Sequence, residues 1–83
     1  MDEFEQRARQ LGDKDYFTAP EVATVLGISS QTLWRWSRES PEAMPEWQRV
    51  GDYRFLNRHQ CLDWCRQLAK TRPDLMARRV TEK

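Results

Sequence analysis

The sequence predicts a single small domain that is mainly α-helical and carries one β-hairpin. Apolar residues recur at helical spacing in several segments, two β-compatible runs flank a Gly-Asp pair, and 83 residues suffice for one modest core. We expect three parts: an N-terminal accessory helix and linker (residues 1–15), a central domain (residues 16–69) and a basic C-terminal tail that forms a short helix (residues 70–83).

The first predicted helix covers residues 2–11. Phe4, Ala8 and Leu11 recur along one face, and Gly12 follows the last of them. A helix of this length is marginal in water by itself. We therefore expect it to dock on its own domain or on a second copy of the chain.

The segment from Thr18 to Arg38 predicts two short helices joined by a tight turn. Thr18 and Glu21 fit a capping box at the start of the first helix, and Gly27 stands where a left-handed residue ends it. Ser29 is suited to cap the second helix. Proteins use this arrangement chiefly to place the second helix in the major groove of DNA. An ordinary helical hairpin without a ligand is the alternative.

Helical geometry divides the second helix into a core face and an outward face. At about 100° per residue, Leu33 and Trp36 face the first helix. The outward face carries Gln31, Trp34, Arg35 and Arg38. Gln can read adenine, Arg can read guanine, and either can hold a phosphate. We expect Trp34 to cover the hairpin, a sugar and thymine methyl group, or a partner subunit.

Residues 47–50 and 53–56 predict two strands joined by a two-residue Gly-Asp turn. Across this turn Arg49 opposes Arg54, and facing like charges cost about 0.2–1 kcal/mol. A phosphate between the two arginines would relieve the repulsion, and the hydroxyl of Tyr53 adds a donor at the tip. A solvated hairpin whose arginines point apart is the alternative.

A further helix follows the hairpin and acts as a structural brace. Asn57 and Gln60 form its capping box. Its apolar positions are Cys61, Leu62, Cys65, Leu68 and Ala69, with Trp64 at the margin. The two cysteines lie one turn apart and lack a second pair of metal ligands, so we expect buried, reduced thiols, no bound metal and a reducing cytoplasm.

The tail repeats a helical pattern beyond Pro73. Leu75, Met76 and Val80 are its apolar residues, and Arg78 and Arg79 are basic. The tail is expected to pack on the preceding helix, pair with a partner or reach along DNA. Residues 2–11 or 73–80 are accordingly the candidate segments for self-association, as a dimer or as an oligomer assembled on DNA.

Three motifs carry a family resemblance. They are Tyr16-Phe-Thr-Ala-Pro-Glu-Val-Ala-Thr-Val-Leu-Gly-Ile-Ser29, Thr32-Leu-Trp-Arg-Trp36 and Gly51-Asp-Tyr-Arg-Phe-Leu56. In this order they resemble the winged helix-turn-helix of the MerR superfamily, in its small branch of excisionases and AlpA-like regulators. The resemblance implies that the second helix enters the major groove while the hairpin, or wing, contacts the backbone or the neighbouring minor groove. It also implies that Gln31 and Arg35 contact bases and that Tyr53 and Arg54 hold phosphates.

The sequence therefore predicts sequence-directed binding of double-stranded DNA, by an excisionase-like architectural factor or a transcriptional regulator of phage or mobile-element type. The candidate DNA-binding residues are Ser30, Gln31, Thr32, Trp34, Arg35, Arg38, Arg49, Tyr53, Arg54 and Arg58. A net charge of only +1 and the acidic Asp52 at the wing tip motivate an alternative, a protein-interaction adaptor without strong DNA affinity. A third possible function is that of the small subunit of a DNA-packaging machine.

Enzymatic and membrane roles find no support in the sequence. The single histidine, His59, has no serine or carboxylate placed to form a catalytic relay, and the three glycines are isolated rather than gathered in a phosphate-binding loop. We therefore expect no enzyme activity and no cofactor. No apolar run approaches the roughly 18 residues of a membrane span, and no basic-then-apolar leader is present, so a cytoplasmic protein is expected.

Overall fold

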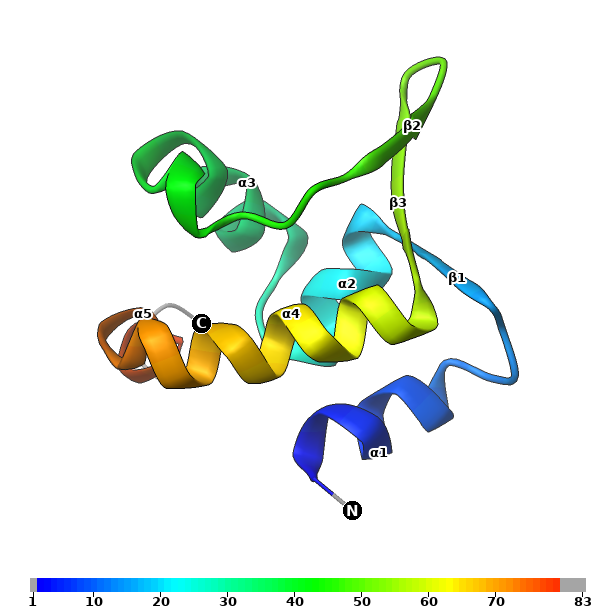
Figure 1. Ribbon diagram of the computed structural model, residues 1–83, viewed down its shortest axis with the longest axis horizontal. Coiled ribbons are helices and arrows are strands. Elements are labelled where there is room, and N and C mark those ends of the chain that lie inside the picture. Colours follow the sequence, from blue (N-terminus) through cyan, green and yellow to red (C-terminus); the bar gives the residue numbers. More distant parts are fainter. Residues whose placement is uncertain (1, 80–83) are drawn as a thin grey trace.

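The computed structural model describes residues 2–79 as a mainly helical molecule with one small sheet (Figure 1). Its elements are α1 (Glu3–Gln10), β1 (Tyr16–Thr18), α2 (Ala19–Leu26), α3 (Ser30–Glu39), the 3-10 turn η1 (Pro41–Ala43), β2 (Gln48–Val50), β3 (Tyr53–Asn57), α4 (Arg58–Thr71) and α5 (Pro73–Arg78). The three strands are antiparallel and lie in the order β1-β3-β2. The predicted combination of helices with a β-hairpin is confirmed.

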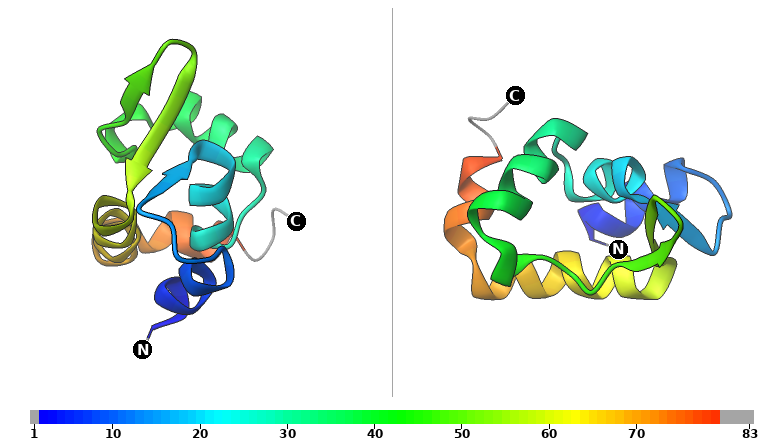
Figure 2. Two further views of the ribbon diagram at one scale, coloured as in Figure 1. Left: turned by 90° about the vertical axis from the view of Figure 1, so that its right-hand side faces the viewer. Right: turned by 90° about the horizontal axis from the view of Figure 1, so that it is seen from above.

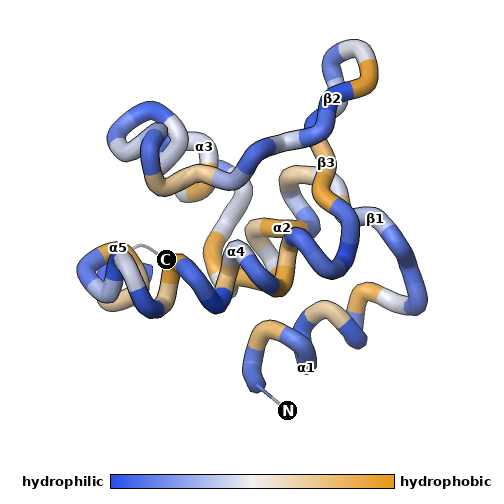
Figure 3. The backbone as a smooth tube through the Cα atoms, viewed as in Figure 1, coloured by the Kyte–Doolittle hydropathy of each residue, from blue (hydrophilic) through white to orange (hydrophobic). Residues whose placement is uncertain are grey.

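Helix α1 lies at the opposite end of the molecule from α3 and the β2–β3 hairpin. In Figure 1 and in the left view of Figure 2, α1 lies at the bottom, whereas α3 and the β2–β3 hairpin rise at the top. Helix α4 runs between these two levels, and α2 packs against it at the centre. Figure 3 shows the apolar stretches of α2 in this central position. Any surface shared by α3 and the hairpin therefore faces away from α1.

Both flanking helices belong to the same core as residues 16–69. Phe4 and Ala8 of α1 and Leu75 of α5 are buried together with Phe17 and Trp36, which are completely enclosed. The expected docking of α1 on its own domain is confirmed, and α5 packs on α4 as one of the predicted arrangements. The apolar faces proposed for self-association are thus used within the chain, and Val80 lies outside the described residues.

Capping interactions fix where two of the helices begin. The Thr18 backbone N–H donates to Glu21 Oε1 at 3.1 Å, and Lys14 pairs with the same carboxylate. Although burial raises the pKa of Glu21, the hydrogen bonds from Lys14 and Thr18 outweigh it and hold the pKa below its usual value. At α4, the Gln60 N–H donates to Asn57 Oδ1 at 2.7 Å, and the Asn57 N–H donates back to Gln60 Oε1 at 3.2 Å. Both predicted capping boxes are confirmed.

The turn between α2 and α3 depends on Gly27. Its φ of 96° lies in the left-handed region, which a side chain disfavours. A Cβ placed there would also approach the guanidinium of Arg7 to 3.1 Å. The Ser29 side chain then caps α3 by accepting from the Thr32 N–H.

Strand β1 is a feature that the sequence analysis did not predict. Phe17 pairs with Leu56 and Thr18 with Phe55 in an antiparallel register. The two paired residues Phe17 and Leu56 are buried, so this pairing fastens β3 to the helical core. Since Thr18 is also the N-cap of α2, the same short strand connects the hairpin to the start of the helix pair.

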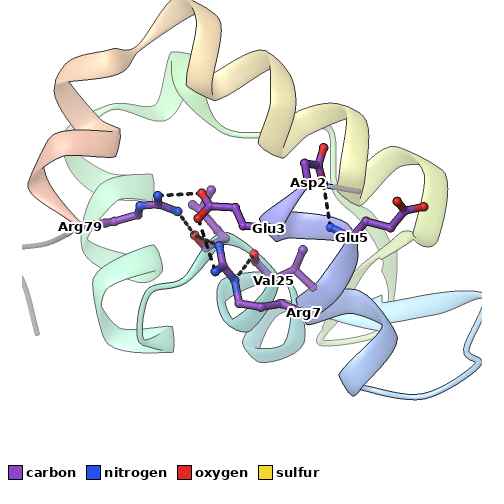
Figure 4. Close-up of polar contacts among 7 residues, drawn as sticks. Asp2, Glu3, Glu5, Arg7, Val25 and Arg79 are labelled. Atoms are coloured by element: carbon purple, nitrogen blue, oxygen red, sulfur yellow. Dashed lines mark hydrogen bonds and ion pairs between the residues drawn. The ribbon is translucent and has the colours of Figure 1, made fainter.

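Two arginines from opposite ends of the chain hold the C-terminal end of α2 (Figure 4). Arg7 Nε donates to the Val25 carbonyl at 2.8 Å, and Arg7 Nη2 donates to the Leu26 carbonyl at 3.2 Å. Arg79 Nη1 donates to the Leu26 carbonyl at 2.8 Å, and its Nη2 pairs with Glu3 at 2.7 Å. The last carbonyls of a helix lack intrahelical partners and carry partial negative charge, so two cations at this position stabilise α2.

The two cysteines are free and buried on α4. A hydrogen bond with Cys61 and burial both raise the pKa of the Cys65 thiol, which therefore stays protonated.

Among the described residues, no helix is long and apolar enough to cross a membrane.

We expect Arg7→Ala to lower the free energy of unfolding by about 1.5–3 kcal/mol, because two charge-assisted hydrogen bonds to carbonyls are lost. Urea unfolding at pH 7 measures this change. Arg9→Ala is the matched control, since Arg9 is exposed on the same helix and its loss should change stability by no more than about 0.5 kcal/mol. Equal losses in the two variants would contradict the role of Arg7.

Candidate nucleic-acid interface

Helix α3 divides its residues between the core and the surface as its sequence predicts. Leu33 and Trp36 are buried against the rest of the molecule. The exposed face carries the candidate residues Ser30, Gln31, Trp34, Arg35 and Arg38. Arg35 stands about one turn from both Gln31 and Arg38, so the three polar side chains of this face are neighbours.

Thr32 is a correction to the candidate set. It was expected to contact DNA, but only 2 % of its surface is exposed. The reason lies in the cap of α3: the Thr32 N–H donates to Ser29 Oγ at 3.1 Å, and Ser29 Oγ donates to Thr32 Oγ1 at 2.9 Å. Thr32, three positions after the N-cap Ser29, therefore uses its backbone N–H and its hydroxyl group to stabilise the start of α3.

Trp34 is half exposed on the outer face of α3. The guanidinium of Arg38 lies over its ring, 4.8 Å from the centroid, within the range of a cation–π interaction. This contact, one helical turn along, fixes the orientation of a large aromatic ring that is 55 % exposed. The combination of an ordered tryptophan and a cation is suited to contact with an anionic partner.

The hairpin has the predicted register, with Arg49 opposite Arg54 and Val50 opposite Tyr53. Successive residues of a strand point to opposite faces of a sheet. Arg49 and Arg54 therefore share one face, while Tyr53 lies on the other. Tyr53 and Arg54 nevertheless line one depression together with Tyr16 and Phe55. That this pair holds phosphates stays a prediction.

The arginine face of the hairpin is turned towards α3. Arg54 lies over the ring of Trp47 at 6.0 Å from the centroid, and both residues line one hollow together with Trp34. The full lining is Ala19, Pro20, Ser30, Leu33, Trp34, Ser37, Trp47 and Arg54. Because α3 and the hairpin both contribute walls to this hollow, the two elements lie side by side at one end of the molecule (Figure 2).

Arg58 contacts the linker between α1 and β1 and was expected to hold a phosphate. Its Nη1 donates to the carbonyls of Gly12 at 3.3 Å and Lys14 at 3.0 Å. Its guanidinium also lies 5.4 Å from the centroid of Phe17. Arg58 therefore holds the linker through Nη1, and its contact with a phosphate stays a prediction.

The described ion pairs gather on α1, α4 and α5. Asp2 pairs with Arg66 at 2.7 Å, and this contact lowers the pKa of Asp2. Further pairs join Glu3 to Arg79, Glu42 to Arg72, Asp74 to Arg72 and Glu39 to Arg78. Within residues 2–79, no carboxylate forms an ion pair with Arg38, Arg49 or Arg54. The modest net charge of +1 thus conceals a local excess of positive charge at α3 and the hairpin.

His59 has a carboxylate neighbour, contrary to the sequence analysis. Its Nε2 lies 3.1 Å from Asp63 Oδ2, one turn along α4, and both side chains are largely exposed. The i, i+4 spacing on a helix explains the contact. In the described part of the chain, no group of His, Cys, Asp or Glu could hold a metal ion.

The candidate interface therefore comprises Ser30, Gln31, Trp34, Arg35 and Arg38 of α3 with Arg49 and Arg54 of the hairpin. Asp52 lies at the tip of the same hairpin and lines a shallow depression with Arg49 and Arg54.

Comparisons with protein-family models, with curated proteins and with solved structures find no match to this chain.

We expect Arg49→Glu to stabilise the protein by about 0.2–1 kcal/mol, because it replaces a repulsive cross-strand pair with an attractive one. Urea unfolding at low salt measures the change, with Arg49→Ala as the control that only removes the repulsion. A destabilisation by Arg49→Glu would show that the arginine pair supports the hairpin rather than an external anion.

Proposed function

We propose that this chain binds double-stranded DNA as a winged helix-turn-helix, with α3 in the major groove and the β2–β3 hairpin as a wing against the backbone. The observation that carries the proposal is the hollow shared by Trp34 and Arg54, because it puts the exposed face of α3 and the arginine face of the hairpin side by side. An α-helix fits the major groove, and a cationic loop next to it meets the phosphates.

Each side chain of the surface has a distinct part in the proposal. Gln31 and Arg35, at the middle of the exposed face of α3, contact base edges through paired hydrogen bonds. Arg38, Arg49 and Arg54 hold phosphates, which relieves the repulsion across the hairpin. Phosphate contacts fix the position of the protein on the duplex, whereas base contacts select the sequence.

We further propose that the protein acts in the cytoplasm as an excisionase-like architectural factor or a transcriptional regulator of phage or mobile-element type. The resemblance of residues 16–69 to that family supports this assignment. Gel mobility of circularly permuted duplexes measures whether the bound DNA is bent, as an architectural role requires. Neither role requires a catalytic step or a cofactor.

The outer face of the sheet favours the alternative of a protein-interaction adaptor. Tyr16, Val50 and Tyr53 are 55 %, 65 % and 75 % exposed, respectively, and Phe55 meets Tyr16 edge to face at 5.5 Å. Exposed apolar patches of this kind mark sites of protein contact. The patch lies on the face of the hairpin opposite the arginines, so an adaptor would use a different surface from a DNA binder.

Titration of a fluorescent random-sequence duplex at low salt, followed by anisotropy, tests the proposal. Non-specific DNA binders reach dissociation constants of roughly 10⁻⁴–10⁻⁶ M even at physiological salt. We expect saturable binding at micromolar protein that weakens as salt rises. The absence of binding at low salt would reject DNA binding and leave the adaptor.

We expect Arg54→Ala to weaken binding to all duplexes and to reduce the slope of log affinity against log salt by about one unit, since one phosphate contact is lost. Arg9→Ala is the matched control, because it removes the same charge from α1 at the other end of the molecule. Equal slopes for the wild type and Arg54→Ala would reject the assignment of the wing.

We expect Arg35→Ala to reduce discrimination between a selected duplex and a random one by about 1–3 kcal/mol, the worth of one paired contact to a base. The measurement compares the affinities of both proteins for both duplexes at one salt concentration. An equal loss of affinity for the two duplexes would instead make Arg35 a phosphate contact.

A further inference from the structure

The hollow between α3 and the hairpin has a mostly apolar lining, which the proposed contacts with phosphates and base edges do not explain. Its walls are mostly apolar, from Leu33 and Trp34 of α3, Trp47 before β2, and Pro20 of α2. The cationic residue of the lining is Arg54. The hollow is partly open and has a volume of about 110 Å³, whereas one water molecule needs only about 10–15 Å³ of such space, so a small apolar group fits inside.

Arginines surround the apolar hollow, which favours a ligand that combines an apolar group with negative charge. Arg54 lines it, Arg38 lies over the ring of Trp34, and Arg49 is the cross-strand neighbour of Arg54. An apolar peptide segment would gain little from three guanidinium groups. A methyl group carried on a polyanion would satisfy both the walls and the rim.

We propose that this hollow receives the C5-methyl group of a thymine, so that Trp34 reads thymine in the bound DNA. The inference rests on the proposed function, because it assumes that α3 lies in the major groove. In that groove the thymine methyl is the apolar group that base pairs present, and apolar side chains recognise thymine through it. Arg54 at the rim holds a phosphate of the DNA backbone, and the Trp34 ring covers the methyl.

Replacement of thymine by deoxyuridine tests the inference, since it removes the methyl and leaves the hydrogen-bonding edge unchanged. The probe is a duplex selected by the wild-type protein from a random pool, resynthesised with each thymine replaced singly. We expect one replacement to weaken wild-type binding about fourfold, the worth of one buried methyl group. Trp34→Ala should bind the thymine and deoxyuridine duplexes equally.

Tyr16→Ala is the matched control, because it removes an exposed aromatic side chain from the outer face of the sheet. It should keep the fourfold preference for thymine. Equal binding of all single replacements by the wild type, or a preference retained in Trp34→Ala, would overturn the inference. Failure to select any duplex would instead overturn the proposed function, so the two failures are distinguishable.

A second measurement uses the wild-type chain alone and does not depend on the folding of a variant. 5-Iodouracil places an iodine where thymine has its methyl, and it crosslinks to adjacent aromatic side chains under ultraviolet light. With iodouracil at the sensitive position, we expect the crosslinked peptide to contain Trp34 or Trp47. A crosslink to Tyr16 or Tyr53 would place the base on the outer face of the sheet and contradict the inference.

Discussion

The pairing of β1 with β3 is the constraint on which the candidate interface depends. A two-stranded hairpin alone is marginally stable in water and would have no fixed direction relative to the helices. Here Phe17 and Leu56 pair and are both buried, which anchors β3 in the core. Thr18 ends β1 and caps α2, while Asn57 ends β3 and caps α4, so each strand passes directly into a helix. These two junctions set the angle between the hairpin and α3, and hence the hollow between them.

The fold also determines where positive and negative side chains lie. The chain has 14 basic and 13 acidic side chains, a balance that by itself gives little attraction to DNA. The fold separates these charges: acidic residues at the N-terminus and around α5 pair with arginines there, as Asp2 does with Arg66 and Glu3 with Arg79. Within residues 2–79, Arg38 of α3 and Arg49 and Arg54 of the hairpin form no ion pair with a carboxylate. Local placement rather than net charge then governs the affinity, and screening by salt will act mainly on this one surface.

Much of the fold was predictable because it depends on local chemistry. Capping boxes, the left-handed Gly27 and the hairpin register each involve residues close in the sequence, and the structure has all of them. Strand β1 was missed because three residues are too few to display a period of two. The contacts of Arg7 and Arg79 with α2 have no sequence signal, since they join positions 18 to 53 residues apart. At the site, Thr32 was assigned by its position in a motif, and its side chain is buried in the cap of α3.

An NMR titration of ¹⁵N-labelled protein with a duplex selected from a random pool tests whether α3 and the hairpin bind DNA together. We expect amide shifts to change along the exposed face of α3 and around the β2–β3 turn, and those of α1 and the outer side of α4 to stay unchanged. Shift changes confined to α1, α4 or the Tyr16 side of the sheet would contradict this expectation.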